Sequence, residues 1–170
     1  LKSFKIRKEF LTKIFCLAEF REISKLQKIS VLSEFQAKNK YLFMAYSPAK
    51  QVKLWQILAS YNKANFLKIK REYYNLLLDL FNTKSSVWKT INALTHIFWY
   101  FKDLSSDEKI FIKETLDIYK EGRIPTSWVM QVVKAYAIKQ NQSYILNQSI
   151  LNPFPRELIE LSDSWRVLEL

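Results

Sequence analysis

The sequence is poor in the residues that turns, disulfides and metal centres require. Its 170 residues include one glycine, Gly122, one cysteine, Cys16, and one histidine, His96. A single cysteine excludes an internal disulfide framework, a thiolate zinc site and a protein-held iron–sulfur cluster, and a single histidine excludes a multi-histidine centre. One glycine cannot form a glycine-rich phosphate loop. We therefore expect no metal site and no cofactor, and we assign no catalytic residue.

The shortage of turn residues also decides the fold class. Besides Gly122, only the prolines at positions 48, 125, 153 and 155 break regular structure. A many-stranded sheet needs more glycine and proline than this for its hairpins. With 49% hydrophobic residues, the chain is long enough for one sizeable core. We expect an all-α fold, in which residues 1–170 form a single compact domain of seven or eight helices.

Apolar spacing and capping signals give the expected helices. They cover about residues 5–27, 30–45, 48–60, 64–81, 83–101, 105–122, 125–140 and 143–151, with a short helix after Pro155. Start and stop signals support these bounds: Ser47 before Pro48, Thr83, Ser105 with Glu108 three residues later, and Gly122. In the first helix, Phe10 and Ile14 are expected to face the core, and Cys16 is interpreted as buried packing.

Charge is unevenly distributed along the chain. The net charge is +11, and residues 1–71 hold 16 basic and 4 acidic residues, whereas residues 72–170 hold 11 basic and 12 acidic residues. A basic half beside a neutral half indicates a polyanionic partner. The alternative is that the lysines only solvate helix surfaces. No apolar run approaches the ~18 residues of a membrane span, and the N-terminus lacks a signal-peptide layout. We expect a cytoplasmic location without membrane contact.

Two groups of polar residues are candidates for binding RNA. In the helices over 30–45 and 64–81, Lys38, Asn39, Lys40, Lys63, Lys70 and Arg71 combine cations with a nearby tyrosine, Tyr74. Cations neutralise phosphates and tyrosine stacks on unpaired bases, which suits RNA better than sequence reading in a DNA groove. We expect these cations to be exposed, several of them on one face.

The second group is a row on the helix over 83–101. Asn92, His96 and Tyr100 follow one another at helical spacing. Such a histidine can bind RNA, or it can be a core residue bonded to a neighbour. General-base catalysis would need an orienting carboxylate, and none lies on this face at helical spacing. We expect His96 at the partly buried edge of a pocket.

Several segments resemble a known family. In order, they read KEFLTKIF, FQAKNKYLFMAYSP, TINALTHIFWYFKDLSSDEK, YKEGRIP and SYILNQSILNPFPREL. This pattern resembles the YbgA-like domain of unknown function, which occurs alone or fused behind a thiouracil-desulfidase-like domain. The resemblance implies an accessory role in holding tRNA while the partner domain removes sulfur from 4-thiouridine.

The resemblance also carries over individual residues. The family's basic and polar motif positions correspond to Lys38, Lys40, Asn92, His96, Tyr100 and Lys102, and its later motifs to Tyr119, Gly122, Pro125, Tyr144, Gln148, Pro153 and Pro155. The chain departs from the family where histidine is usual, at Gln36, Asn39, Tyr46 and Thr90, and Trp99 replaces a glycine. Any metal or proton-transfer centre built from those histidines is absent here, whereas the amide and hydroxyl groups at these positions would still permit hydrogen bonds to RNA.

Three hypotheses follow for the function. The first is an RNA-binding accessory domain, with tRNA as the expected RNA, that works with a desulfidase-like domain in cis or in trans and has no chemistry of its own. The second is a protein-interaction module that uses its basic face. The third is a small enzyme centred on His96.

Overall fold

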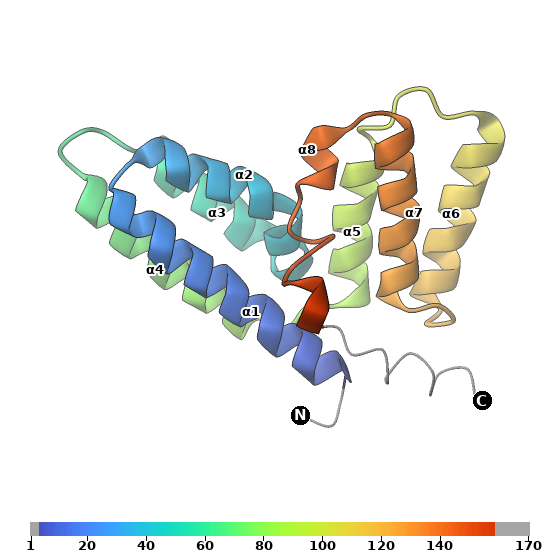
Figure 1. Ribbon diagram of the computed structural model, residues 1–170, viewed down its shortest axis with the longest axis horizontal. Coiled ribbons are helices and arrows are strands. Elements are labelled where there is room, and N and C mark those ends of the chain that lie inside the picture. Colours follow the sequence, from blue (N-terminus) through green and yellow to red (C-terminus); the bar gives the residue numbers. More distant parts are fainter. Residues whose placement is uncertain (1–3, 159–170) are drawn as a thin grey trace.

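The structure is all-α, as the sequence predicts. The computed structural model describes residues 4–158, which form eight α-helices and two short 3-10 turns and contain no strand (Figure 1). The elements are α1 (Phe4–Ile23), η1 (Ser24–Leu26), α2 (Ile29–Tyr46), α3 (Pro48–Ala59), α4 (Phe66–Asn82), α5 (Val87–Phe98), α6 (Ser106–Lys120), α7 (Thr126–Lys139), α8 (Ser143–Leu146) and η2 (Arg156–Leu158). The helix expected after Pro155 is the turn η2 as far as the description extends.

The helices form two groups joined by α2. The helices α1 to α4 lie along one another on one side of the molecule, and α5, α6 and α7 stand side by side on the other (Figure 1). Helix α2 packs against α3 and α4 in its own group and against α5 in the second group. It is therefore the central helix of the molecule.

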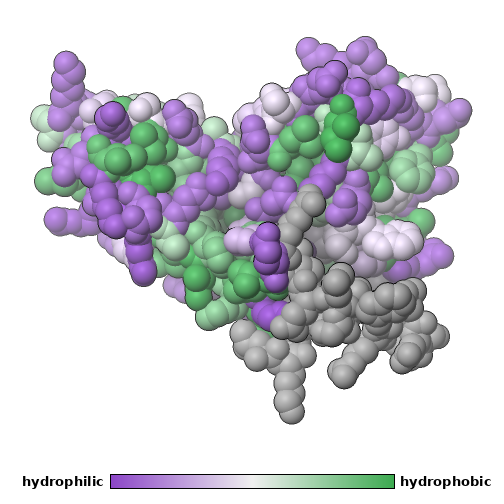
Figure 2. Space-filling model, viewed as in Figure 1, coloured by the Kyte–Doolittle hydropathy of each residue, from purple (hydrophilic) through white to green (hydrophobic). Residues whose placement is uncertain are grey.

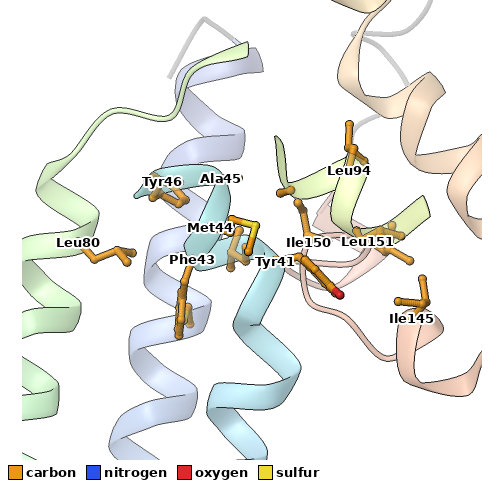
Figure 3. Close-up of a cluster of buried hydrophobic side chains, with 14 of the residues drawn as sticks. Tyr41, Phe43, Met44, Ala45, Tyr46, Leu80, Leu94, Ile145, Ile150 and Leu151 are labelled. Carbon is orange, nitrogen blue, oxygen red and sulfur yellow. The ribbon is translucent and has the colours of Figure 1, made fainter. Parts of the chain in front are cut away.

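The burial of α2 explains its position. Every residue from 41 to 46 is buried, and Phe43 is fully buried. An α-helix that is apolar on all sides needs neighbours on all sides. Figure 3 shows the side chains of this segment, with Tyr46 on the side of Leu80 and Tyr41 on the side of Ile150 and Leu151.

Most of the capping signals act as the sequence predicts. The Ser47 side chain accepts a hydrogen bond from the Lys50 amide at the start of α3, a cap that typically contributes about 1 kcal/mol. Ser105 and Glu108 form the expected capping box, and Gly122 has a φ of 76° after α6. The expected start of α5 at Thr83 is wrong, because Ser86 supplies the capping oxygen there.

The orientation of α1 also corrects the expectation. Phe10 and Ile14 are about half exposed, whereas Thr12, Cys16 and Phe20 face the core. Helix α1 carries large apolar side chains on several of its sides, so their spacing in the sequence did not define one buried face. The buried face is fixed by aromatic packing, since Phe20 stacks on the rings of α4 tyrosines Tyr73 and Tyr74 at 5.4 and 5.6 Å.

Residues 143–151 return to the middle of α2. The expected helix over this segment stops at Leu146, and turns follow. The Ser149 amide donates to the carbonyl of Lys38 at 3.0 Å, and the Gln148 side-chain amide donates to the carbonyl of Ala37 at 3.0 Å. These bonds bring α8 beside α2, where it closes one end of the groove described next.

Candidate nucleic-acid interface

A groove runs between α2 and α3 and ends at α8. Its volume is about 620 Å³, and we call it the α2–α3 groove. Its lining residues are Ser33, Gln36, Ala37, Lys40, Gln51, Val52, Trp55, Leu58, Ala59 and Tyr144. Lys40 is the one charged residue among them, and Trp55 is 59% exposed. The groove therefore combines an accessible aromatic ring with a positive charge and no carboxylate.

Three tyrosines pack together at the α8 end of the groove. Tyr41, Tyr100 and Tyr144 form this tyrosine cluster, with ring centroids 6.4, 6.4 and 5.4 Å apart. The Lys40 ammonium lies 5.3 Å from the centroid of the Tyr41 ring, within the range of a cation–π interaction. The cluster holds Lys40 at the groove and joins α2 to α8 and to the turn after α5.

Two hydroxyl groups of this cluster, those of Tyr41 and Tyr144, have raised pKa values. Burial raises the pKa of Tyr41, and a hydrogen bond with Tyr100 raises it further. Burial also raises the pKa of Tyr144. Desolvation has this effect because it disfavours the charged phenolate. Tyr41 and Tyr144 therefore remain neutral hydrogen-bonding groups at the end of the groove.

Two buried glutamines contribute amide groups to the groove. The Gln36 side chain accepts a hydrogen bond from the Tyr73 hydroxyl and donates to the Gln51 carbonyl at 3.5 Å, so both of its ends are used. Gln51 is 8% exposed, and its side-chain amide has no hydrogen-bond partner among residues 4–158. The Gln148 Oε1 atom is unpartnered and sealed from solvent, whereas the amide atoms of Gln51 are not sealed from solvent. The Gln51 amide therefore faces the groove with its donors and acceptor available.

A second depression lies on the other side of α2 and has the opposite character. It has a volume of about 680 Å³ and lies between α1, α2 and the segment 149–157. Its charged lining residues are Glu19, Glu22, Glu157 and Lys38, and Lys38 pairs with Glu19 at 2.7 Å. Three carboxylates around one neutralised lysine disfavour a phosphate group. We call this the acidic depression and do not assign RNA to it.

Two cations that are close in the sequence, Lys38 and Lys40, lie at different depressions. Lys38 lines the acidic depression and Lys40 lines the α2–α3 groove. Side chains that are two residues apart on an α-helix point about 200° from each other around the helix axis. The expected common face is therefore wrong for this pair, although both side chains are accessible as expected.

The remaining predicted cations lie at the far end of the α1–α4 group. Lys63 is exposed in the turn between α3 and α4, Arg71 is exposed on α4, and Lys70 is half-buried there. Tyr74, which was expected to stack on a base, is half-buried with its ring against Phe20. These cations are accessible to phosphate, but the neighbouring tyrosine already belongs to the aromatic packing of the core.

Asn39 is a correction to the predicted site. It is 1% exposed, and its side-chain oxygen accepts from the Ser149 hydroxyl at 2.6 Å and lies 3.8 Å from the Cys16 sulfur. Its side-chain nitrogen donates to the Phe35 carbonyl at 2.9 Å. An RNA cannot reach Asn39, because α1 and the 149 turn cover it. The prediction of a buried Cys16 is confirmed, since it is 4% exposed.

The row on α5 does not form one site. Asn92 is exposed, His96 is half-buried, and Tyr100 lies beyond the helix in the tyrosine cluster. His96 borders neither depression, and its ring contacts Trp99 edge-on at a centroid distance of 4.5 Å. Lys102 is exposed in the following turn. The structure therefore brings Tyr100 and Lys40 into one cluster and leaves His96 outside it.

Sequence reasoning missed Trp55 and the groove position of Tyr144. The four described tryptophans, at positions 55, 88, 99 and 128, are 59–68% exposed, although tryptophan is usually well buried. A signal for Trp55 was present, because Leu54 and Leu58 mark the buried stripe of α3 and Trp55 lies beside it. Figure 2 shows that hydrophobic side chains interrupt the hydrophilic surface over both helix groups.

Within residues 4–158, no three His, Cys, Asp or Glu side chains converge in a way that could hold a metal ion. No helix in the same range is long and apolar enough to cross a membrane.

The structure is thus an all-α fold with an open groove of polar and aromatic side chains on its central helix. Residues 40–155 match the family model described as "Protein of unknown function (DUF1722)", so the chain belongs to this family, of which YbgA-like domains are members. The match includes Lys40, Trp55, Tyr100 and Tyr144 and begins after α1 and the first part of α2. No curated protein and no solved structure matches the chain.

Proposed function

We propose that this chain is an RNA-binding accessory domain without catalytic activity of its own, and that the α2–α3 groove contacts the RNA. The observation that carries the proposal is the combination in this groove of an exposed indole, Trp55, with one cation, Lys40, and no acidic side chain. Stacking on aromatic rings and neutralisation of phosphates are the two main contributions to binding of single-stranded nucleic acid. The 16-to-4 excess of basic residues over residues 1–71 adds long-range attraction.

The identity of the RNA and of the partner rests on the YbgA-like resemblance. On that basis tRNA is the RNA, and a 4-thiouridine desulfidase-type domain acts beside this chain in the cytoplasm, in cis or in trans. The groove supports binding and not chemistry, because Lys40 and Tyr144 are not accompanied there by a carboxylate or a histidine. The accessory domain would hold the tRNA while the partner performs the reaction.

Titration of tRNA at several salt concentrations tests this proposal. We expect Lys40→Gln to weaken tRNA binding and to reduce the magnitude of the salt slope by roughly 0.7 to 0.9. Lys113→Gln is the matched control, because Lys113 is an exposed lysine on α6 outside the groove. Equal slopes for the two variants, or tighter binding to an acidic protein than to tRNA at the same salt, would contradict the proposal.

One observation favours a protein-interaction module as the second candidate. Ile6, Phe10 and Ile14 form an apolar row on the exposed side of α1, with exposures of 56, 50 and 44%. An exposed apolar row of this kind is typical of protein interfaces. Loss of binding to a protein partner, and not to tRNA, in Phe10→Ser would support this second candidate.

A further inference from the structure

We propose that the α2–α3 groove holds an unpaired base, stacked against Trp55, with its hydrogen-bonding edge toward the Gln51 amide and its phosphate beside Lys40. This inference rests on the proposed function and deepens it, because it names the kind of RNA that the groove accepts. The occupant is a nucleotide in a loop, a bulge or a single strand, and not a base pair within a duplex.

The dimensions of the groove support an unpaired occupant. Along α2 it extends from Ser33 to Lys40, which is about 10 Å at the rise of an α-helix. In an RNA duplex the faces of the bases are covered by their stacked neighbours. A ring as exposed as Trp55 can therefore stack only on a base that has left the duplex.

The polar groups in the groove support a base over an apolar ligand. Gln51 is more than nine-tenths buried, lines the groove, and has no side-chain hydrogen bond within the described chain. Its amide atoms are reachable from the groove, so a ligand there can form hydrogen bonds with them. Because an amide offers both donors and an acceptor, it pairs with the edge of a nucleobase. The apolar walls, Val52 and Leu58, contact the rest of the ring.

The position of Lys40 supports a nucleotide over a free base. Lys40 is held beside the Tyr41 ring, at the end of the groove where Tyr144 closes it. The groove is about 10 Å long along α2. The Lys40 ammonium at one end is therefore within reach of the phosphate of a nucleotide whose base stacks on Trp55. The α2–α3 groove thus offers separate contacts for the ring, the edge and the phosphate.

Fluorescence anisotropy with short labelled RNAs tests this inference. The probes are hexauridylate, hexaadenylate, a six-residue abasic ribose-phosphate strand and a 12-base-pair RNA duplex, with intact tRNA as reference. We expect Trp55→Ala to weaken hexanucleotide binding about 5- to 150-fold and to leave binding of the abasic strand unchanged within twofold. Trp128→Ala is the matched control, because Trp128 is 66% exposed on α7 outside the groove, and we expect it to bind like the native chain.

A second variant separates the edge contact from stacking. In Gln51→Met the side chain keeps its approximate length and loses its amide. We therefore expect the ratio of the affinities for hexauridylate and hexaadenylate to approach one. Binding of the abasic strand should stay as before. Far-ultraviolet circular dichroism melts confirm that each variant is folded. Phenylalanine at position 55 retains a ring, so Trp55→Phe should recover part of the lost affinity.

The outcomes distinguish the two proposals. If tRNA and the hexanucleotides fail to bind the native chain, the proposed function and this inference both fail. If tRNA binds, but Trp55→Ala and Trp128→Ala have equal affinity for the hexanucleotides, the RNA-binding function stands and the base site is wrong. If the abasic strand or the duplex binds as tightly as the hexanucleotides, the groove contacts only phosphates and the inference is again wrong.

Discussion

The two helix groups use polar residues in different ways. In the α1–α4 group, Gln36, Asn39 and Gln51 are buried on α2 and α3. In the α5–α7 group, the buried polar residues are Thr90 and Thr115, and Thr115 bonds within its own helix, to the Phe111 carbonyl at 2.8 Å. The first group also has the excess of positive charge, while residues 72–170 are nearly neutral. Buried amide side chains are therefore a feature of the α1–α4 group, and among these three Gln51 alone has no side-chain hydrogen bond within residues 4–158.

This contrast shows why charge alone did not locate the site. The basic residues of the first half face both the acidic depression and the α2–α3 groove, as Lys38 and Lys40 show. The α2–α3 groove combines the exposed Trp55 ring with the Gln51 amide and no carboxylate, whereas three carboxylates line the acidic depression. Helix α1 lies on one side of α2, and the α2–α3 groove is open on another side. The candidate site lies on the side that is left open.

The largest expected effect tests whether the core is concentrated on α2. Phe43 is fully buried, with ring contacts to Phe35 and Phe81 at 6.0 and 6.2 Å. We expect Phe43→Ala to lower the free energy of unfolding by about 3–5 kcal/mol, since it removes buried surface and leaves a cavity. Phe111→Ala on α6 is the matched control, because Phe111 is 48% exposed, and we expect at most about 1 kcal/mol. Urea unfolding measures both, and equal losses would show that the core is not centred on α2.

A smaller effect is expected from the buried polar network. Asn39→Leu leaves the Ser149 hydroxyl without its buried acceptor, so we expect a loss of roughly 1–3 kcal/mol in the free energy of unfolding. Asn92→Leu provides the control, because Asn92 is an exposed asparagine on α5 and should change stability by less than about 0.5 kcal/mol. If Asn39→Leu is as stable as the native chain, the polar contact between α2 and the 149 turn does not contribute to folding.

The same contrast explains how far the sequence predicts the fold. The bounds of α6 were predicted closely, because Ser105, Glu108 and Gly122 are local signals that need no tertiary context. The exposure of Phe10 and Ile14 was not predictable, since α1 has apolar residues on several sides and the choice of face depends on Tyr73 and Tyr74 of α4.

The candidate site was predictable only in part. Lys40 and Tyr100 were identified from residue type, and the structure places both in or beside the tyrosine cluster. The burial of Asn39 was not predictable, because Ser149, 110 positions later, supplies its partner. Trp55 and Tyr144 share a groove although 89 positions separate them, and helical spacing contains no information on such pairs.

The smallest expected effect concerns Glu108 and tests whether the second group is stabilised by local charges. The Lys139 ammonium donates to Glu108 at 2.6 Å and, with the Ser105 amide at 2.8 Å, lowers the pKa of the carboxyl group below its ordinary value. A carboxyl group with a lowered folded pKa stabilises the protein above its unfolded pKa of about 4.3 and loses this contribution as pH falls through the folded pKa. Glu108→Gln keeps a capping-box acceptor but has no charge to titrate. We therefore expect the difference in unfolding free energy between the native chain and Glu108→Gln to shrink as the pH is lowered from 6 through this range. Urea unfolding at a series of pH values measures that difference, and a difference independent of pH would show that the Glu108–Lys139 pair does not stabilise the junction of α6 and α7.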